Sequence, residues 1–175
     1  MKIGNKNIGL DYPPFVIAEM SGNHNQSIET ALNVVKAAAE AGAHALKLQT
    51  YTPQTITLNA PQEEFFIRDK KSIWNGQKLH NLYMEAHTPW EWHEEIFKEA
   101  KKNNILAFST PFDETAVDFL ETLDVPAYKI ASFEAKHIPL IRKVASTGKP
   151  MIISTGMCEI HEISETVTEA KKSGC

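Results

Sequence analysis

Residues 45–51 read ALKLQTY, a short apolar run in which Lys47 and Gln49 stand two positions apart. Because successive side chains of a strand point to opposite faces, this spacing places Lys47 and Gln49 on one face. Four other runs are similarly apolar: Phe15–Met20 (FVIAEM), Ile105–Thr110 (ILAFST), Ala127–Phe133 (AYKIASF) and Met151–Thr155 (MIIST). Near-continuous apolar runs of this length are typical of strands buried on both faces of a parallel sheet.

Helical segments with recognisable ends separate these runs. Ser27 is placed to cap a helix that reaches Ala41. The motif Thr88-Pro89-Trp90-Glu91 predicts a capping box that opens a helix extending to about Asn103. Three more helices are predicted: Glu114–Leu123 capped by Asp113, a segment with Pro139 in its first turn, and a segment whose apolar face carries Ile160, Ile163, Val167 and Ala170. Strands that alternate with helices predict parallel βα units with right-handed crossovers.

The spacing of the units is compatible with two architectures. The last three predicted strands start about 22 residues apart, which suits a tight (β/α) barrel or a doubly wound sheet. No Gly-x-Gly-x-x-Gly motif follows the first strand, where a dinucleotide-binding fold would carry one. Ile3–Gly9 predicts a small hairpin, and Thr52–His87 predicts an extended loop over one end of the sheet. Length alone does not decide between the two architectures.

Polar residues gather where the predicted strands end, which is where barrel enzymes place their sites. These residues are Glu19, Lys47, Gln49, Ser109, Thr110, Lys129, Ser132, Glu134, Ser154 and Thr155. Burying a lysine without a counter-charge costs several kcal/mol, so Lys47 and Lys129 could each pair with an internal carboxylate. Two lysines beside several hydroxyl groups favour an anion site instead, because both group types donate hydrogen bonds to phosphate and carboxylate oxygens.

Composition excludes several classes of function. The 175 residues carry a formal net charge of -4 and are 42% hydrophobic, which gives no reason to expect nucleic acid or an anionic membrane as a partner. No apolar run approaches the roughly 20 residues of a membrane span, and the N-terminus lacks the apolar core of a signal peptide. With only two cysteines, Cys158 and Cys175, the sequence predicts a reducing, cytoplasmic location.

Motifs in a fixed order resemble the sialic acid synthase family along the whole chain. They are Ile17-Ala18-Glu19 with Asn23-His24, Lys47-Leu48-Gln49-Thr50, Phe108–Phe119 (FSTPFDETAVDF), Tyr128–Glu134 (YKIASFE) and Gly148–Met157 (GKPMIISTGM). Within that family, Trp74, Leu82–His93 (LYMEAHTPWEWH) and Ile130–Glu134 (IASFE) are most similar to the pseudaminic acid synthases. The synthases of sialic and legionaminic acids remain the alternative, with a protein that binds phosphoenolpyruvate or a sugar phosphate without catalysis as a third possibility.

The resemblance implies a TIM-type (β/α)8 barrel whose base is plugged by an N-terminal hairpin. Residues 1–175 would be the N-terminal portion of that barrel, about five βα units, so the chain is expected to lack the remaining units and the family's C-terminal antifreeze-like domain. Family members are domain-swapped homodimers, in which the small domain reaches into the partner's site. We therefore expect the isolated chain to be inactive and prone to associate through its unpaired strands.

The resemblance also implies a reaction and a role for each matching residue. The enol carbon of phosphoenolpyruvate attacks the aldehyde of an N-acetylated amino sugar, water adds to the neighbouring carbon, and phosphate leaves. Phosphoenolpyruvate would be held by Lys47, Thr110, Lys129, Ser132 and Ser154, while Glu19, Gln49 and Glu134 would face the sugar and the reacting carbons. A divalent metal, manganese or magnesium, would polarise the aldehyde, but the family's metal-binding histidines match none of the seven present. His24 either lines the site or makes a loop hydrogen bond.

Overall fold

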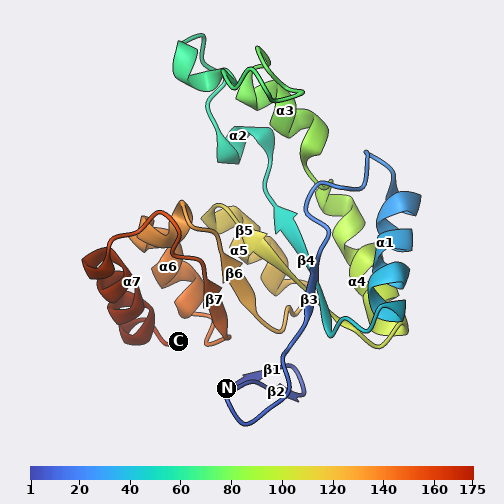
Figure 1. The fold of residues 1–175 in the computed structure, drawn as a ribbon. Coiled ribbons are helices and arrows are strands. Elements are labelled where there is room, and N and C mark those ends of the chain that lie inside the picture. Colours follow the sequence, from blue (N-terminus) through green and yellow to red (C-terminus); the bar gives the residue numbers. More distant parts are fainter.

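A computed structural model describes all of residues 1–175, and its centre is a sheet of five parallel strands (Figure 1). The strands are β3 (Ile17–Glu19), β4 (Ala45–Thr50), β5 (Leu106–Pro111), β6 (Tyr128–Ile130) and β7 (Met151–Ile153). Their order in the sheet is β3-β4-β5-β6-β7, the same as their order in the chain. A doubly wound sheet would reverse direction at a central strand, so this order confirms the barrel-type arrangement.

Helices follow the strands and pack next to one another. They are α1 (Ile28–Glu40), α4 (His93–Lys102), α5 (Glu114–Glu121), α6 (Ile138–Ala145) and α7 (Ile160–Lys172), with short 3-10 turns η2 (Trp90–Trp92) and η3 (Glu134–Lys136). With strands added in one direction and every crossover right-handed, all connecting helices must lie on one face of the sheet. The opposite, inner face is therefore free to carry polar groups.

Two of the predicted helix caps are confirmed and one is wrong. The Ser27 side chain accepts a hydrogen bond from the backbone N–H of Thr30, and Asp113 accepts one from Thr115. Thr88 caps nothing, because Pro89 is in a non-helical conformation and the chain first makes the turn η2 before α4 begins. The Thr88 hydroxyl instead lies 3.1 Å from His24 Nε2, a residue 64 positions away.

The segment between β4 and α4 differs from the predicted extended loop. It contains α2 (Pro53–Ile56), η1 (Glu63–Phe65) and α3 (Leu79–Ala86), and an isolated antiparallel bridge pairs Phe66, just after η1, with Lys78, just before α3. Its position was predicted correctly, since it stands beyond the carboxyl end of β4 (Figure 1). Pro53 and the side-chain cap made by Thr52 start a helix of only four residues, too short for a periodic pattern to reveal.

The predicted N-terminal hairpin closes the other end of the sheet. It consists of β1 (Lys2–Ile3) and β2 (Lys6–Asn7), and it lies below the strands in Figure 1. Ile3 is buried, and a side chain at Gly4 would meet Leu106 at the start of β5 within 2.9 Å. The hairpin therefore packs against the amino end of the sheet, away from the polar strand ends.

The hydrophobic core consists of two clusters of buried side chains. Leu46 and Leu48 of β4 pack with Val35 of α1 and Ile96 of α4, and a second cluster joins β6 to α5 and α6 through Tyr128, Val117, Leu120, Ile141 and Val144. Since Leu46 and Leu48 face the helices, Lys47 and Gln49 face the other way. No helix is long and apolar enough to cross a membrane.

Candidate active site

Strand register brings the predicted lysines onto one face. Glu19 is level with Lys47, Gln49 with Thr110, and Ser109 with Tyr128. Residues level with one another on neighbouring parallel strands point to the same side. Lys129, next to Tyr128, therefore shares the inner face with Thr110, Gln49 and Lys47. The same register sends Ser109 to the outer face, although the strand ends had suggested that it belongs to the site.

Lys47 has a carboxylate partner within the site. Its Nζ lies 2.7 Å from Glu19 Oε1 and 3.4 Å from the hydroxyl of Thr110. Lys47 is only 8% exposed, whereas the side chain of Glu19 is 54% exposed. Lys47 thus pairs with an internal carboxylate, which was one of the two predicted possibilities. Because its partner is open to solvent, an incoming anion can compete for this ammonium group.

Lys129 is held by neutral groups. Its Nζ donates to the Ser154 hydroxyl at 2.6 Å and to the carbonyl of Ile130 at 2.7 Å. Burial lowers the pKa of Lys129, as does the positive charge of Lys47, while Glu19 and Glu134 act in the opposite direction. The pKa of Lys129 therefore depends on the charges of Lys47, Glu19 and Glu134. A lysine without a carboxylate contact, beside a hydroxyl, has the chemistry of an anion ligand.

Glu134 begins the turn η3 after β6 and lacks a complete set of partners. Its Oε2 is buried and accepts no hydrogen bond from any group of the chain. Burial raises the pKa of Glu134 above its usual range, although Lys129 and His137 pull it back. Such a carboxyl group can carry a proton closer to neutral pH than an exposed glutamate. Ser132, two residues earlier, is half-buried, and its hydroxyl makes no hydrogen bond within the chain.

The loop after β3 orients Gln49. Ser21 donates a hydrogen bond of 2.8 Å to Gln49 Oε1, which leaves the amide N–H groups of Gln49 available as donors. Ser21 adopts a left-handed backbone conformation with φ of 53°, which is costly for a residue other than glycine. Strain of this kind persists only where surrounding contacts enforce it, so this loop is held in place by its neighbours.

Those neighbours belong to α3 and the segment that follows it. Gln26 donates two hydrogen bonds to this segment, to the carbonyls of Glu85 at 2.7 Å and His87 at 2.8 Å. His24 is fully buried, contacts Thr88 and stacks edge-on against Trp92. The loop hydrogen bond predicted as one role for His24 is therefore the one observed. The loop after β3 thus connects Gln49 to α3.

Three aromatic residues of the site were missed by the sequence analysis. Tyr51 and Phe112 continue the inner-face alternation of Lys47–Gln49 and Phe108–Thr110 by one more step. Their rings meet at 5.4 Å, and the ring of Tyr83 from α3 meets Tyr51 at 5.6 Å, both edge-to-face. Extending the period-two pattern by two residues would have found Tyr51 and Phe112. No local pattern marks Tyr83.

A second set of polar side chains lies on the outer face of the sheet, away from the candidate site. The hydroxyl of Thr50 lies 2.6 Å from that of Ser109 and 2.8 Å from His93 Nε2, and His93 Nδ1 lies 3.2 Å from the carbonyl of Pro89. The side chains of Thr50, Ser109 and His93 are all buried. Burial lowers the pKa of His93 to about 4, so the ring is neutral near pH 7.

Residues 34–175 match a protein family described as the NeuB family. The chain belongs to the NeuB family. It is 48% identical over 174 residues to a pseudaminic acid synthase of Campylobacter jejuni, a match that covers 98% of this chain and 50% of that protein. The N,N'-diacetyllegionaminic acid synthase of the same species is 34% identical over 164 residues, covering 91% of this chain and 47% of that one. This NeuB-family chain spans about half the length of the curated relatives that it matches.

A solved structure of the family has the same fold. The N-acetylneuraminic acid synthetase of Leptospira borgpetersenii superimposes with a TM-score of 0.82 at 32% identity, covering 99% of this chain and 55% of that one. A truncated 3-deoxy-D-arabino-heptulosonate 7-phosphate synthase of Thermotoga maritima, at 16% identity and a TM-score of 0.68, supports the fold alone. The sheet of this NeuB-family chain is therefore half of a TIM-type barrel.

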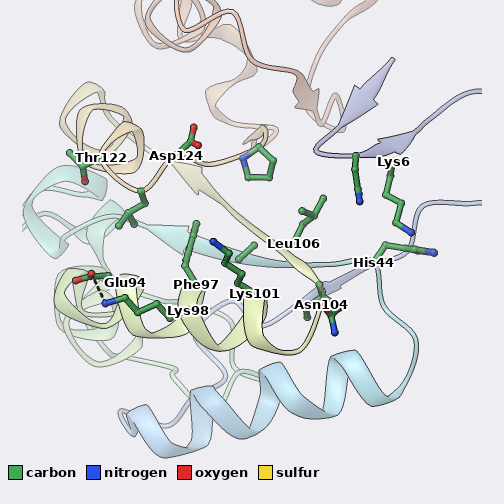
Figure 2. Close-up of a pocket in the computed structure, with 15 residues that line it drawn as sticks. Lys6, His44, Glu94, Phe97, Lys98, Lys101, Asn104, Leu106, Thr122 and Asp124 are labelled. Atoms are coloured by element: carbon green, nitrogen blue, oxygen red, sulfur yellow. Dashed lines mark ion pairs between the residues drawn. The ribbon is translucent and has the colours of Figure 1, made fainter.

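No three His, Cys, Asp or Glu side chains of residues 1–175 cluster in a way that could hold a metal ion. A cavity of about 810 Å³ lies away from the candidate site. It lies between α4, the end of α5 and the N-terminal hairpin, with Lys6, His44 and Asn104 at one end and Thr122 and Asp124 at the other (Figure 2). Lys98 at its wall is paired with Glu94, so the charge there is partly neutralised. Lys47 and Lys129 of the candidate site lie at the opposite end of the strands.

Proposed function

We propose that this chain forms the phosphoenolpyruvate-binding half of a pseudaminic acid synthase active site. The observation that supports this function best is the placement of Lys47 and Lys129 on one inner face, each beside a hydroxyl group. The 48% identity to a pseudaminic acid synthase supports the choice within the family.

Phosphoenolpyruvate carries a phosphate and a carboxylate, and the two lysines can each serve one of them. Lys129 and Ser154 offer a charged donor and a hydroxyl 2.6 Å apart, a spacing that suits two oxygens of one anionic group. Lys47 would exchange Glu19 for the second group, with Thr110 beside it and Ser132 completing the set. Glu19, released from Lys47, is exposed enough to remain hydrated.

Glu134 and Gln49 are proposed to act on the reacting carbons. The enol carbon of phosphoenolpyruvate forms a bond to the aldehyde carbon of the amino sugar, and the aldehyde oxygen takes up a proton. Water then adds to the neighbouring carbon, and inorganic phosphate leaves. The raised pKa of Glu134 suits a group that gives or takes a proton in these steps, and the Gln49 amide can donate to a developing oxyanion.

The remaining parts of the active site are proposed to lie outside residues 1–175. They are the ligands of a manganese or magnesium ion and the antifreeze-like domain of a second subunit in a domain-swapped homodimer. By this proposal the 175-residue chain alone is inactive. We further propose that the synthase works in the cytoplasm, where phosphoenolpyruvate is made.

A synthase for legionaminic or sialic acid is the second candidate. The same polar groups would serve it, because all these reactions use phosphoenolpyruvate and an amino-sugar aldehyde. The identity of 48% to the pseudaminic acid synthase, against 34% to the legionaminic acid synthase of the same species, favours the first. A non-catalytic protein that binds phosphoenolpyruvate would keep the lysines but would not need Glu134.

Two proteins test the proposal: the purified 175-residue chain, and a chimaera of residues 1–175 with the second half of the Campylobacter jejuni pseudaminic acid synthase. We expect both to bind phosphoenolpyruvate in a calorimetric titration. Only the chimaera should release phosphate when manganese and the pseudaminic acid precursor sugar are added. Absence of phosphoenolpyruvate binding to both proteins would contradict the proposal. Faster turnover with a legionaminic acid precursor would select the second candidate.

A further inference from the structure

The helices outside the sheet leave a gap between α4 and α5. Helix α1 packs on α4, α5 on α6 and α6 on α7, whereas α4 and α5 do not pack closely on one another. Near the start of α4 the gap is filled by aromatic rings, since Trp90 and His93 both contact Phe119 of α5. Because α5 ends at Glu121, the second half of α4 has no helix on that side. The cavity of about 810 Å³ occupies this part of the gap.

The cavity belongs to the middle of the sheet and not to its open edges. Its walls come from α4, the start of β5, the segment after α5 and the turn of the N-terminal hairpin (Figure 2). The edge strands β3 and β7 contribute none of its lining residues. Strands added beside β3 or β7 would therefore not fill it. Its volume also lies within the roughly 300–1,000 Å³ that is typical of small-molecule sites.

Three hydrogen-bond donors at one end of the cavity have no acceptor within the chain. They are the ammonium group of Lys6, the side-chain amide of Asn104 and the Nε2 hydrogen of His44. The position of that hydrogen follows from the other ring nitrogen, because His44 Nδ1 accepts a hydrogen bond of 2.9 Å from the backbone N–H of Val16. Donors without acceptors, one of them charged, have the chemistry of an anion site.

The charges along the cavity leave a surplus of positive charge. Both acidic side chains of the lining are already paired with lysines, Glu94 with Lys98 at 2.6 Å and Asp124 with Lys149 at 3.4 Å. Lys6 and Lys101 also line the cavity, and neither forms an ion pair within the chain. A phosphate monoester carries about 1.5 to 2 negative charges near pH 7, which matches these two free ammonium groups.

The middle of the cavity is apolar. Figure 2 shows Phe97 and Leu106 between the end with Lys6 and the end with Thr122 and Asp124. Phe97, Leu106 and Leu123 are partly buried and pack against the hydrophobic core, so they form a fixed floor. An aromatic ring can lie on such a floor, whereas a small inorganic anion would leave it uncovered. The ligand is therefore expected to carry a flat ring as well as a phosphate.

We propose that this cavity binds a nucleoside monophosphate. Its phosphate lies at Lys6, His44 and Asn104, and its base lies on Phe97 and the neighbouring apolar side chains. The exposed carboxylate of Asp124, at the far end, can accept a hydrogen bond from an amino group of the base. This site is separate from the proposed phosphoenolpyruvate site, which lies at the other end of the strands, and it does not depend on that function.

A calorimetric titration of the 175-residue chain with AMP tests this site. Excess phosphoenolpyruvate is present throughout, so that AMP cannot be bound by the lysines of the candidate active site. We expect saturable binding of AMP, and binding of ribose 5-phosphate that is at least about tenfold weaker because it lacks the base. Lys6→Ala should weaken AMP binding by about tenfold or more, the effect of one charge-assisted contact. Lys101→Ala, on α4, should also weaken it and tests the site independently of the hairpin.

Lys2→Ala is the matched control for Lys6→Ala. Lys2 is exposed on β1 of the same hairpin and does not line the cavity, so AMP binding should stay within about twofold. Thermal unfolding without ligand should be the same for the two hairpin variants, which shows that the hairpin is intact.

Four outcomes would overturn the proposed nucleotide site. They are no binding of AMP, AMP affinity that is unchanged in either Lys6→Ala or Lys101→Ala, equal affinity for AMP and ribose 5-phosphate, and binding of AMP that occurs only without phosphoenolpyruvate. The last result would show that AMP occupies the phosphoenolpyruvate site. Failure of the chain to bind phosphoenolpyruvate, with AMP binding retained, would contradict the proposed function and leave the nucleotide site standing.

Discussion

Both faces of β4 and β5 carry buried polar groups, but the two faces differ in whether these groups find hydrogen-bond partners within the chain. On the outer face Thr50, Ser109 and His93 satisfy one another and the carbonyl of Pro89, so the group is complete without any ligand. On the inner face Glu134 has an unpartnered oxygen, and Lys129 has no carboxylate partner. A satisfied network stabilises the fold, whereas an unsatisfied one costs stability and binds ligands. Mutations on the outer face should therefore mainly reduce stability, whereas mutations on the inner face should mainly reduce ligand binding.

The largest effect should come from removing the outer-face histidine. His93→Ala removes one of the two partners of the Thr50 hydroxyl, which then bonds only to Ser109, and opens a cavity next to Phe97 and Phe119. We expect the free energy of unfolding to fall by about 3–4 kcal/mol, measured by urea denaturation. His161→Ala, at an exposed position of α7, should change it by less than about 0.5 kcal/mol. A small loss in His93→Ala would mean that the network does not stabilise the fold.

The pH dependence of stability should reveal the same histidine. The pKa of His93 is about 4 in the folded chain, below its usual value of 6.5, so folding favours the neutral ring. The contribution is fully present above pH 6.5 and is lost as the pH falls toward and through 4, on the order of 3 kcal/mol in total. The difference between the stability curves of the parent and His93→Gln between pH 7 and 4 isolates this term. Parallel curves would refute it.

On the inner face, Lys129→Ala should reduce binding rather than stability. Loss of a charge-assisted contact of about 1.5–3 kcal/mol weakens phosphoenolpyruvate binding by roughly 10- to 150-fold. Stability should hold or rise, because the substitution removes a desolvated ammonium group. Calorimetric titration and thermal unfolding of the same sample measure both quantities. Lys101→Ala, an exposed α4 residue at the opposite end of the strands, should change neither.

The smallest expected change in stability comes from a substitution on the inner face. Glu134→Gln replaces a carboxylate that has an unpartnered buried oxygen by a neutral amide of the same shape. We expect stability to change by less than about 1 kcal/mol and to rise rather than fall, since the cost of burying a charge disappears. Turnover by the chimaera should nonetheless drop sharply. A large loss of stability would place Glu134 among the structural residues instead.

The comparison also separates what could be predicted from what could not. Alternation along β4 and β5 assigned Lys47 and Gln49 to one face, because the period of a strand is a local property. The same rule, carried two residues further, covers Tyr51 and Phe112. The caps at Ser27 and Asp113 were predictable too, since each bonds to a backbone N–H two or three residues away.

Contacts between distant segments were decided only by the tertiary structure. Thr88 has the sequence context of a helix cap, but it pairs with His24 because the loop after β3 brings that histidine to it. The contact between the rings of Tyr83 and Tyr51 depends on the path of residues 52–88, and the burial of Ser109 on the outer face depends on strand register. Sequence by itself determined the approximate positions of the strands, most helix ends and the alternation of side chains along a strand, because these follow from short-range geometry. Tertiary structure decided which polar groups find partners, because a partner many residues away is set by packing and not by local pattern.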